Sequence, residues 1–165
     1  MCGRYTHKLT WAEIVKLYQL TLPDQEPLGF RQSYNVAPTD VMPIIRPAGN
    51  GRELMMAGWG LIPYWLKPEA LKQRPFSTIN ARAETIATAP TYREPFAKRR
   101  CLVPATGSYE WQKLDAKKKQ PYHFRPKAAE PFAFAGVYDV WKGGRSKATR
   151  LVPDANAKAA PPRRP

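Results

Sequence analysis

The chain has 165 residues, of which 43% are hydrophobic and 12% aromatic, and its formal net charge is +14 at pH 7. A chain of this length and composition can bury one hydrophobic core, so a globally disordered protein is excluded. It contains two cysteines, which are too few for a disulfide scaffold, and it has neither a signal-peptide core nor a long apolar run.

The predicted elements begin with a helix over residues 11–20, because Thr10 and Glu13 match a capping box and apolar residues follow at helical spacing. Short runs typical of strands come next: 41–46, 53–59, 101–104, 108–113, 121–125 and 132–141. Two short helices are predicted over 81–88 and 92–100. The Lys-rich stretch 115–120 indicates a turn that joins two strands into a hairpin.

Many short strands, few helices and no regular strand–helix alternation predict an α+β fold. We expect a mostly antiparallel, barrel-like curled sheet with a few short flanking helices. Residues 142–165 are basic, rich in Pro, Ala and Arg, and without periodicity, which predicts a disordered tail after a domain at residues 1–141.

The basic charge favours a polyanionic partner, and nucleic acid is the usual one. No Cys or His spacing suggests a metal site, and we expect no cofactor. We also expect a monomer in a reducing cytoplasmic compartment, with no membrane association.

Cys2 has the most distinctive potential chemistry. Met1 precedes a small residue, a context in which the initiator methionine is removed, so Cys2 would carry a free α-amine beside its thiol. An aldehyde can react with both groups, because the amine forms a Schiff base and the thiolate then closes onto the imine carbon as a thiazolidine. Position alone is weak evidence, since a cysteine can be incidental there. Cys101 follows in an apolar strand and is expected to be a buried structural thiol.

Five motifs in order make the sequence similar to the SOS-response-associated peptidase (SRAP) family, whose members protect abasic sites in single-stranded DNA. The matching stretches are MCGRY at 1–5, YNVAPT at 34–39, WGLIP at 59–63 with Trp65, NARAET at 80–85 and RCLVPATGSYEW at 100–111, followed by 121–122 and 132–136. Each motif is modest alone, but together they extend from residue 1 to about residue 141.

The resemblance implies a catalytic set of three residues. Cys2 would form a thiazolidine with the ring-opened sugar aldehyde of an abasic site. Asn80 would orient the substrate or Cys2, and Glu110 would act as the general acid and base. The implied function is to sense abasic sites in single-stranded DNA, at the nucleoid, and to shield them covalently during the DNA damage response.

The resemblance also implies a set of DNA contacts. Arg4 and Arg82 would hold the phosphates that flank the lesion, a role that suits the planar guanidinium group. Asn35, Trp59 and Trp65 would line the DNA groove, with the tryptophans offering an aromatic face to an exposed base.

Structural explanations exist for several of these residues. Asn80 could cap a following helix, Glu110 could be a solvent-facing residue between two inward aromatics, and both tryptophans could pack in the core. Two other functions stay open as well. One is a peptidase with Cys2 as its N-terminal nucleophile, and the other is a non-catalytic module that binds single-stranded DNA.

The sequence departs from the family after the predicted strand 132–141. Family members carry further strands there and an Ile-His-Asp-Arg-Met-Pro-like segment whose histidine assists the Schiff-base chemistry. This sequence has no such segment, and neither His7 nor His123 matches it, so we assign neither a catalytic role. The sequence therefore looks shortened near residue 145, and we expect an exposed sheet edge and impaired reversal of the crosslink.

Overall fold

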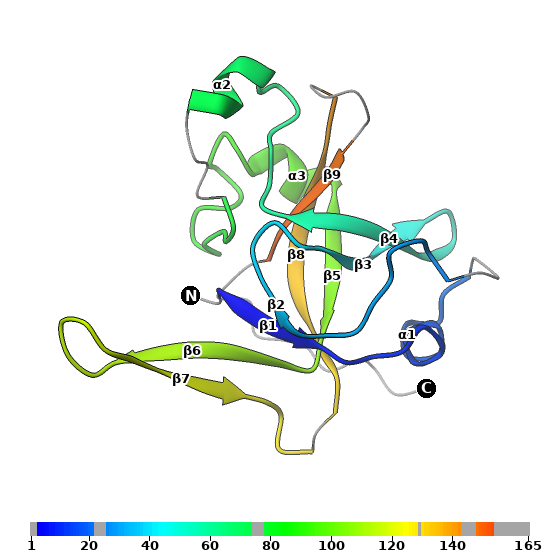
Figure 1. Ribbon diagram of the computed structural model, residues 1–165. Coiled ribbons are helices and arrows are strands. Elements are labelled where there is room, and N and C mark those ends of the chain that lie inside the picture. Colours follow the sequence, from blue (N-terminus) through cyan, green and yellow to red (C-terminus); the bar gives the residue numbers. More distant parts are fainter. Residues whose placement is uncertain (1–2, 22–25, 74–77, 129, 143–147, 154–165) are drawn as a thin grey trace.

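The computed structural model describes residues 3–21, 26–73, 78–128, 130–142 and 148–153 (Figure 1). Its strands form two sheets, mostly with antiparallel pairing, and short helices flank them, which confirms the predicted α+β class. None of the helices in these residues is long and apolar enough to span a membrane.

One sheet is a closed barrel with the strand order β3-β4-β9-β8-β5. Its strands are β3 (Val41–Ala48), β4 (Gly51–Trp59), β5 (Arg100–Ala105), β8 (Phe132–Trp141) and β9 (Ala148–Pro153). Strand β3 is buried on both faces, since Ile44 belongs to the core cluster with Trp59 while Ile45 packs in a second cluster with Ile14. This double burial explains why β3 has a nearly continuous apolar run instead of an alternating pattern.

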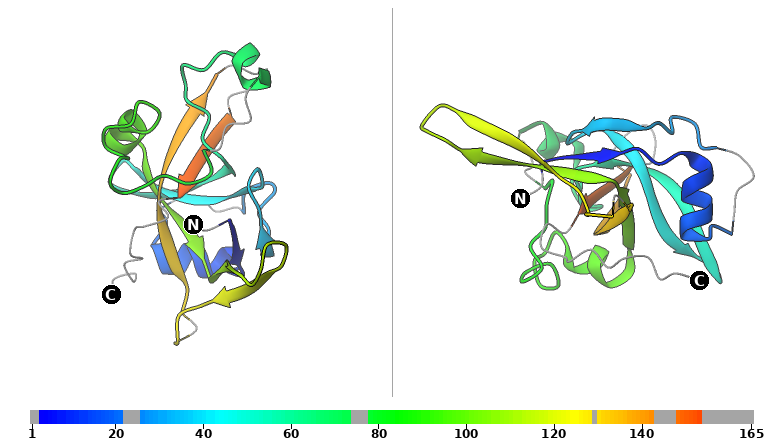
Figure 2. Two further views of the ribbon diagram at one scale, coloured as in Figure 1. Left: turned by 90° about the vertical axis from the view of Figure 1, so that its left-hand side faces the viewer. Right: turned by 90° about the horizontal axis from the view of Figure 1, so that it is seen from below.

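The second sheet has the order β2-β1-β6-β7 and packs on the barrel through Tyr5. Its strands are β1 (Arg4–His7), β2 (Ser33–Val36), β6 (Gly107–Lys113) and β7 (Lys119–Phe124). The hairpin of β6 and β7 extends away from the rest of the molecule (Figures 1 and 2), and every residue of β7 is exposed.

Helix α1 (Trp11–Tyr18) confirms the predicted capping box. The backbone N–H of Thr10 donates to Glu13 Oε2 over 2.7 Å, and the N–H of Glu13 donates to Thr10 Oγ1 over 3.3 Å. The helix ends at Tyr18, because Gln19 adopts a left-handed conformation with φ of 49°. The predicted helix over 92–100 is also found, as α3 (Arg93–Lys98).

Two predictions from the sequence are wrong. Residues 83–88 form successive turns in place of a helix, in a stretch where β-branched residues lower the helix propensity. The tail expected to be disordered contains β9, which pairs with β8 from Gly136↔Pro153 to Trp141↔Ala148 and runs parallel to β4. The local composition disfavours regular structure, but pairing with β8 and β4 stabilises the strand, since strand formation depends strongly on tertiary context. Residues 143–147 and 154–165 of that tail lie outside the described residues.

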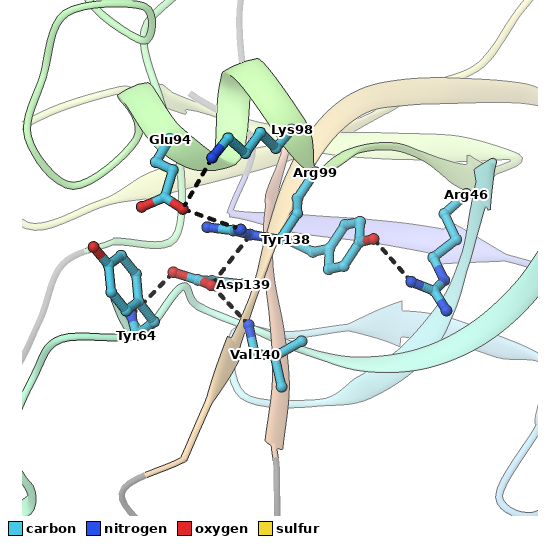
Figure 3. Close-up of polar contacts among 8 residues, drawn as sticks. All are labelled: Arg46, Tyr64, Glu94, Lys98, Arg99, Tyr138, Asp139 and Val140. Carbon is cyan, nitrogen blue, oxygen red and sulfur yellow. Dashed lines mark hydrogen bonds and ion pairs between the residues drawn. The ribbon is translucent and has the colours of Figure 1, made fainter. Parts of the chain in front are cut away.

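A polar network fixes α3 against the barrel (Figure 3). Asp139 is buried on β8, and its carboxylate accepts a hydrogen bond from the Tyr64 N–H at 3.0 Å and lies 3.3 Å from Arg99 Nε. Arg99 also pairs with Glu94 of α3 at 3.4 Å. A buried carboxylate is tolerated here because its charge and lone pairs have partners.

Candidate functional site

Strand β1 brings the start of the described chain against β6. Arg4 pairs with Tyr109 and Tyr5 pairs with Ser108. A Cβ placed on Gly3 would lie 4.0 Å from the ring of Trp111. Cys2 lies outside the described residues, but its covalent neighbour Gly3 is therefore next to the Tyr109–Trp111 segment that carries Glu110.

Glu110 is half-buried and lies opposite Tyr122 in the hairpin. Side chains alternate along a strand, so Glu110 shares a face with Ser108, and Ser108 is paired with the buried Tyr5. We call this face, which packs on the barrel at Tyr5, the inner face of the sheet. The alternative that Glu110 faces solvent between two inward aromatics is therefore wrong, since Tyr109 and Trp111 point to the opposite side.

Asn80 lies at the end of a segment that runs beside the barrel. The carbonyl of Thr78 accepts a hydrogen bond from the Leu61 N–H at 3.2 Å, and the carbonyl of Ile79 accepts one from Trp59 Nε1 at 2.6 Å. Asn80 itself is half-buried, and its carbonyl accepts a bond from the Tyr92 hydroxyl at 3.4 Å. Residues 83–88 after it form turns, and the next α-helix of the described residues, α3, begins only at Arg93, so the helix-cap explanation of Asn80 is not supported.

Tyr5 and Trp59 connect the segments that carry the candidate residues. Their ring centroids are 5.4 Å apart, and both belong to the same core cluster as the partly buried Ile79. Through these contacts the strand that follows Cys2, the Asn80 segment and the inner face of β6 are packed onto one another. The segments of Asn80 and Glu110 are thus joined to the strand that follows Cys2, which itself lies outside the described residues.

The predicted DNA contacts fall into separate groups. Arg4 and Asn35 lie together, since Arg4 Nη1 donates to Asn35 Oδ1 over 2.8 Å. Trp59 is only 1% exposed, so its expected role as a stacking surface is wrong, and core packing explains it instead. Trp65 is 52% exposed, and Arg82 has an exposed side chain two residues after Asn80.

The two histidines and Cys101 have different environments. His7 is completely buried, and burial lowers its pKa to about 4, an effect that the Pro104 carbonyl offsets only in part. His123 is exposed on β7, with its ring centroid 4.8 Å from that of Tyr109. Cys101 is buried, as expected from the sequence, and burial raises its pKa to about 12.

The sequence reasoning missed an exposed aromatic group on the side of the sheet opposite Glu110. We call this side the outer face, and it carries Arg4, Asn35, Tyr109, Trp111 and His123, while Tyr34 lies at the irregularity in the pairing of β1 with β2. The signal was the alternation Tyr109-Glu110-Trp111 along β6, but alternation alone does not say which face of a strand meets the core, and the two aromatic residues were taken to face inward.

Comparison with known proteins gives a consistent result. The profile of the family described as SOS response associated peptidase (SRAP) matches residues 1–160. The chain is 40% identical over 144 residues to the abasic site processing protein YoqW of Bacillus subtilis, covering 86% of this chain and 61% of that protein. It is 30% identical over 153 residues to the abasic site processing protein HMCES of Gallus gallus, covering 74% of this chain and 45% of that one. The chain thus spans less than two thirds of the length of these relatives.

Solved structures support the same fold. A crystal structure of a protein from Bordetella bronchiseptica superposes with a TM-score of 0.74 at 25% identity, over 92% of this chain and 70% of that one. A crystal structure of a protein from Bacteroides thetaiotaomicron gives a TM-score of 0.64 at 32% identity, over 88% of this chain and 59% of that one.

Proposed function

Since the chain belongs to the SOS response associated peptidase family, we propose that it processes abasic sites in single-stranded DNA by forming a covalent crosslink through Cys2. The relatives named abasic site processing proteins support the general role. The observation that carries the proposal is the packing of the chain start at Gly3 against the Glu110 segment of β6.

The proposed chemistry has two steps. After removal of Met1, the α-amine of Cys2 adds to the C1′ aldehyde of the ring-opened sugar, and the carbinolamine loses water to give an imine. The thiolate of Cys2 then adds to the imine carbon, the nitrogen takes up a proton, and a thiazolidine ring closes. The net reaction joins protein and DNA with the loss of one water and needs no oxidant or cofactor.

Glu110 and Asn80 have roles that this chemistry requires. A carboxylic acid next to the reacting nitrogen can donate a proton to the leaving hydroxyl of the carbinolamine and can accept a proton from the thiol. The neutral amide of Asn80 can donate and accept hydrogen bonds without competing for these protons. Arg4, hydrogen-bonded to Asn35, offers a guanidinium next to the chain start for a flanking phosphate.

The test is a crosslinking assay with a single-stranded oligonucleotide that carries one abasic site. The protein is expected to give a shifted band that survives denaturant, while Cys2→Ala and protein that retains Met1 give none. An oligonucleotide with every base intact is the control. A full yield of crosslink from protein with Met1 attached would exclude the thiazolidine mechanism.

A peptidase is the second candidate, and the family description as a peptidase favours it. The same assay separates the two, because a peptidase would give a cleaved peptide and no DNA adduct. Glu110→Gln is informative in both cases. We expect it to slow crosslinking by about 10²–10⁴-fold, which is the usual contribution of general acid–base catalysis.

A further inference from the structure

The barrel has an open cavity of about 420 Å³ where β3 and β5 separate. These two strands pair at Ile45↔Leu102, and beyond this pair β3 continues in its hairpin with β4 as far as Ala48↔Gly51. Phe96 of α3 lines the cavity as well. We propose that this cavity binds a small amphipathic anion, a molecule with a compact apolar body and one carboxylate group.

The barrel wall separates the cavity from the candidate site. Ile44 and Ile45 are neighbours in β3 and therefore point to opposite faces of the strand. Ile44 packs in the core cluster with Trp59, whereas Ile45 lines the cavity with its partner Leu102. None of the described residues assigned to the candidate site lines the cavity. A ligand bound there would thus take no part in the proposed crosslink.

Most of the lining is apolar. It comes from three strands of the barrel, from α3 and from the turns before α3, and its larger apolar residues are Ile45, Pro47, Ile86, Phe96, Leu102 and Val137. Phe96 is 36% exposed and Leu102 is 38% exposed, so part of this apolar surface is in contact with water. The volume falls within the range of about 300–1,000 Å³ that is usual for small-molecule sites, whose walls are mostly apolar with a few polar groups.

The polar groups of this cavity are positively charged. Arg46, Arg52 and Arg100 line it, and none of the described lining residues is acidic. Arg46 already pairs with Glu53 and donates to the Tyr138 hydroxyl over 3.0 Å (Figure 3). Arg52 and Arg100 are exposed, and no carboxylate of the described residues forms an ion pair with either one. Two guanidinium groups at the cavity are thus available to an anion.

Arginine suits a carboxylate ligand because its planar guanidinium can donate two parallel hydrogen bonds to one carboxylate. Arg52 Nη1 donates to the Tyr18 carbonyl over 3.0 Å, which holds the guanidinium in place and leaves its other N–H groups for a ligand. Such fixed donors reduce the entropy that binding costs. A neutral apolar molecule would leave both charges unused and a cation would be repelled, so the lining favours an anion with an apolar body.

The experiment titrates the full chain with decanoate by isothermal titration calorimetry at physiological ionic strength. We expect saturable binding of one decanoate per chain. Butyrate keeps the carboxylate but lacks the apolar length, and decyltrimethylammonium keeps the chain but reverses the charge, so each should bind at least about tenfold more weakly. Binding of several decanoates per chain, or equal binding of the cationic analogue, would overturn the proposal.

Matched variants locate the site. Arg100→Gln should weaken decanoate binding about tenfold, in the range of a lost charge-assisted hydrogen bond, whereas Lys113→Gln removes the same charge from the β6–β7 hairpin and should bind like the wild type. Leu102→Glu places a carboxylate in the cavity and should abolish binding. Leu114→Glu makes the same exchange at a leucine that is 57% exposed outside the cavity, and it should change nothing.

Thermal unfolding checks that each variant folds. Arg100 has an exposed side chain, so Arg100→Gln tests the site even if Leu102→Glu fails to fold. Equal losses of decanoate binding in the cavity variants and in their controls would mean that net charge alone attracts the ligand, and would overturn the proposal.

A segment of another protein is the competing occupant. The peptide Glu-Asp-Leu-Phe-Asp-Glu carries an apolar centre between acidic residues, and we expect that it does not displace decanoate. Displacement by this peptide, with peptide binding weakened by Arg100→Gln and unchanged by Lys113→Gln, would assign the cavity to an acidic protein segment and overturn the small-molecule site.

Discussion

The barrel and the four-stranded sheet use tryptophan in opposite ways. In the barrel, Trp59 is enclosed, packs on Tyr5 and donates its indole N–H to the Ile79 carbonyl. In the sheet, Trp111 lies half in solvent, next to Tyr109. A tryptophan in a motif therefore does not by itself indicate a binding surface, because the face of the strand determines whether its ring is buried or exposed to solvent.

The largest effect that would test this contrast is expected at Trp59. Trp59→Ala removes a fully buried ring and leaves a cavity, so we expect a loss of about 3–5 kcal/mol in the free energy of unfolding. Trp111→Ala should cost less than about 1 kcal/mol, because its ring is partly exposed. Urea denaturation of both variants measures the difference. Equal losses in the free energy of unfolding would contradict the conclusion that Trp59 stabilises the core and Trp111 does not.

The next effect concerns the polar network that holds α3 on the barrel. Asp139→Ala leaves Arg99 without its buried partner and the Tyr64 N–H without its acceptor, so we expect a loss of about 3 kcal/mol. Asp139→Asn keeps an acceptor oxygen and should lose less. Thermal unfolding of the two variants gives the comparison, and an alanine variant as stable as wild type would show that the network is dispensable.

The pH dependence of stability should reflect the burial of His7 on β1. Because burial lowers the pKa of His7 from 6.5 to about 4, the unfolded chain takes up its proton first as the pH falls. Stability from the neutral imidazole is present above pH 6.5 and is lost between pH 6.5 and about 4, by up to roughly 3 kcal/mol. His7→Leu should flatten this part of the pH profile of stability. A profile that is identical in His7→Leu and wild type would contradict the account of His7.

The smallest of these effects is expected at the N-terminus of α1. Thr10→Ala removes the side-chain acceptor of the Glu13 N–H, and loss of such a cap typically costs about 1 kcal/mol. Thr10→Ser keeps the hydroxyl oxygen and should be close to wild type. Because α1 packs on Ile45 and Leu54 of the barrel, the loss should appear in the unfolding midpoint, and the yield of the proposed crosslink should stay unchanged.

The sequence carries enough local information for most of the barrel and for α1. The strand 132–141 and the capping box at Thr10 were predicted because β-branched, aromatic and capping residues sit in clear patterns there. Strands β1 and β2 were missed because four residues give too little periodicity. Strand β9 was missed because its pairing with β8 stabilises it, and the residues of β9 alone do not reveal that partner.

The candidate site could be predicted in part. The motif resemblance pointed to Asn80 and Glu110, and the fold packs their segments onto the strand that follows Cys2. The resemblance could not show that Trp59 is buried and Trp111 is partly exposed. The burial of each ring depends on which face of its strand meets the barrel. Burial depends on the pairing of distant strands, and no local pattern in the sequence encodes it.

The most direct test of the central claim is mass spectrometry of the crosslinked product after borohydride treatment. We predict that trypsin releases the peptide Cys2-Gly3-Arg4 joined to the sugar, with a mass equal to the sum of the two parts minus one water. Borohydride should not change this mass, because a thiazolidine has no imine to reduce. An adduct on another residue, or one that gains hydrogen on reduction, would contradict the account.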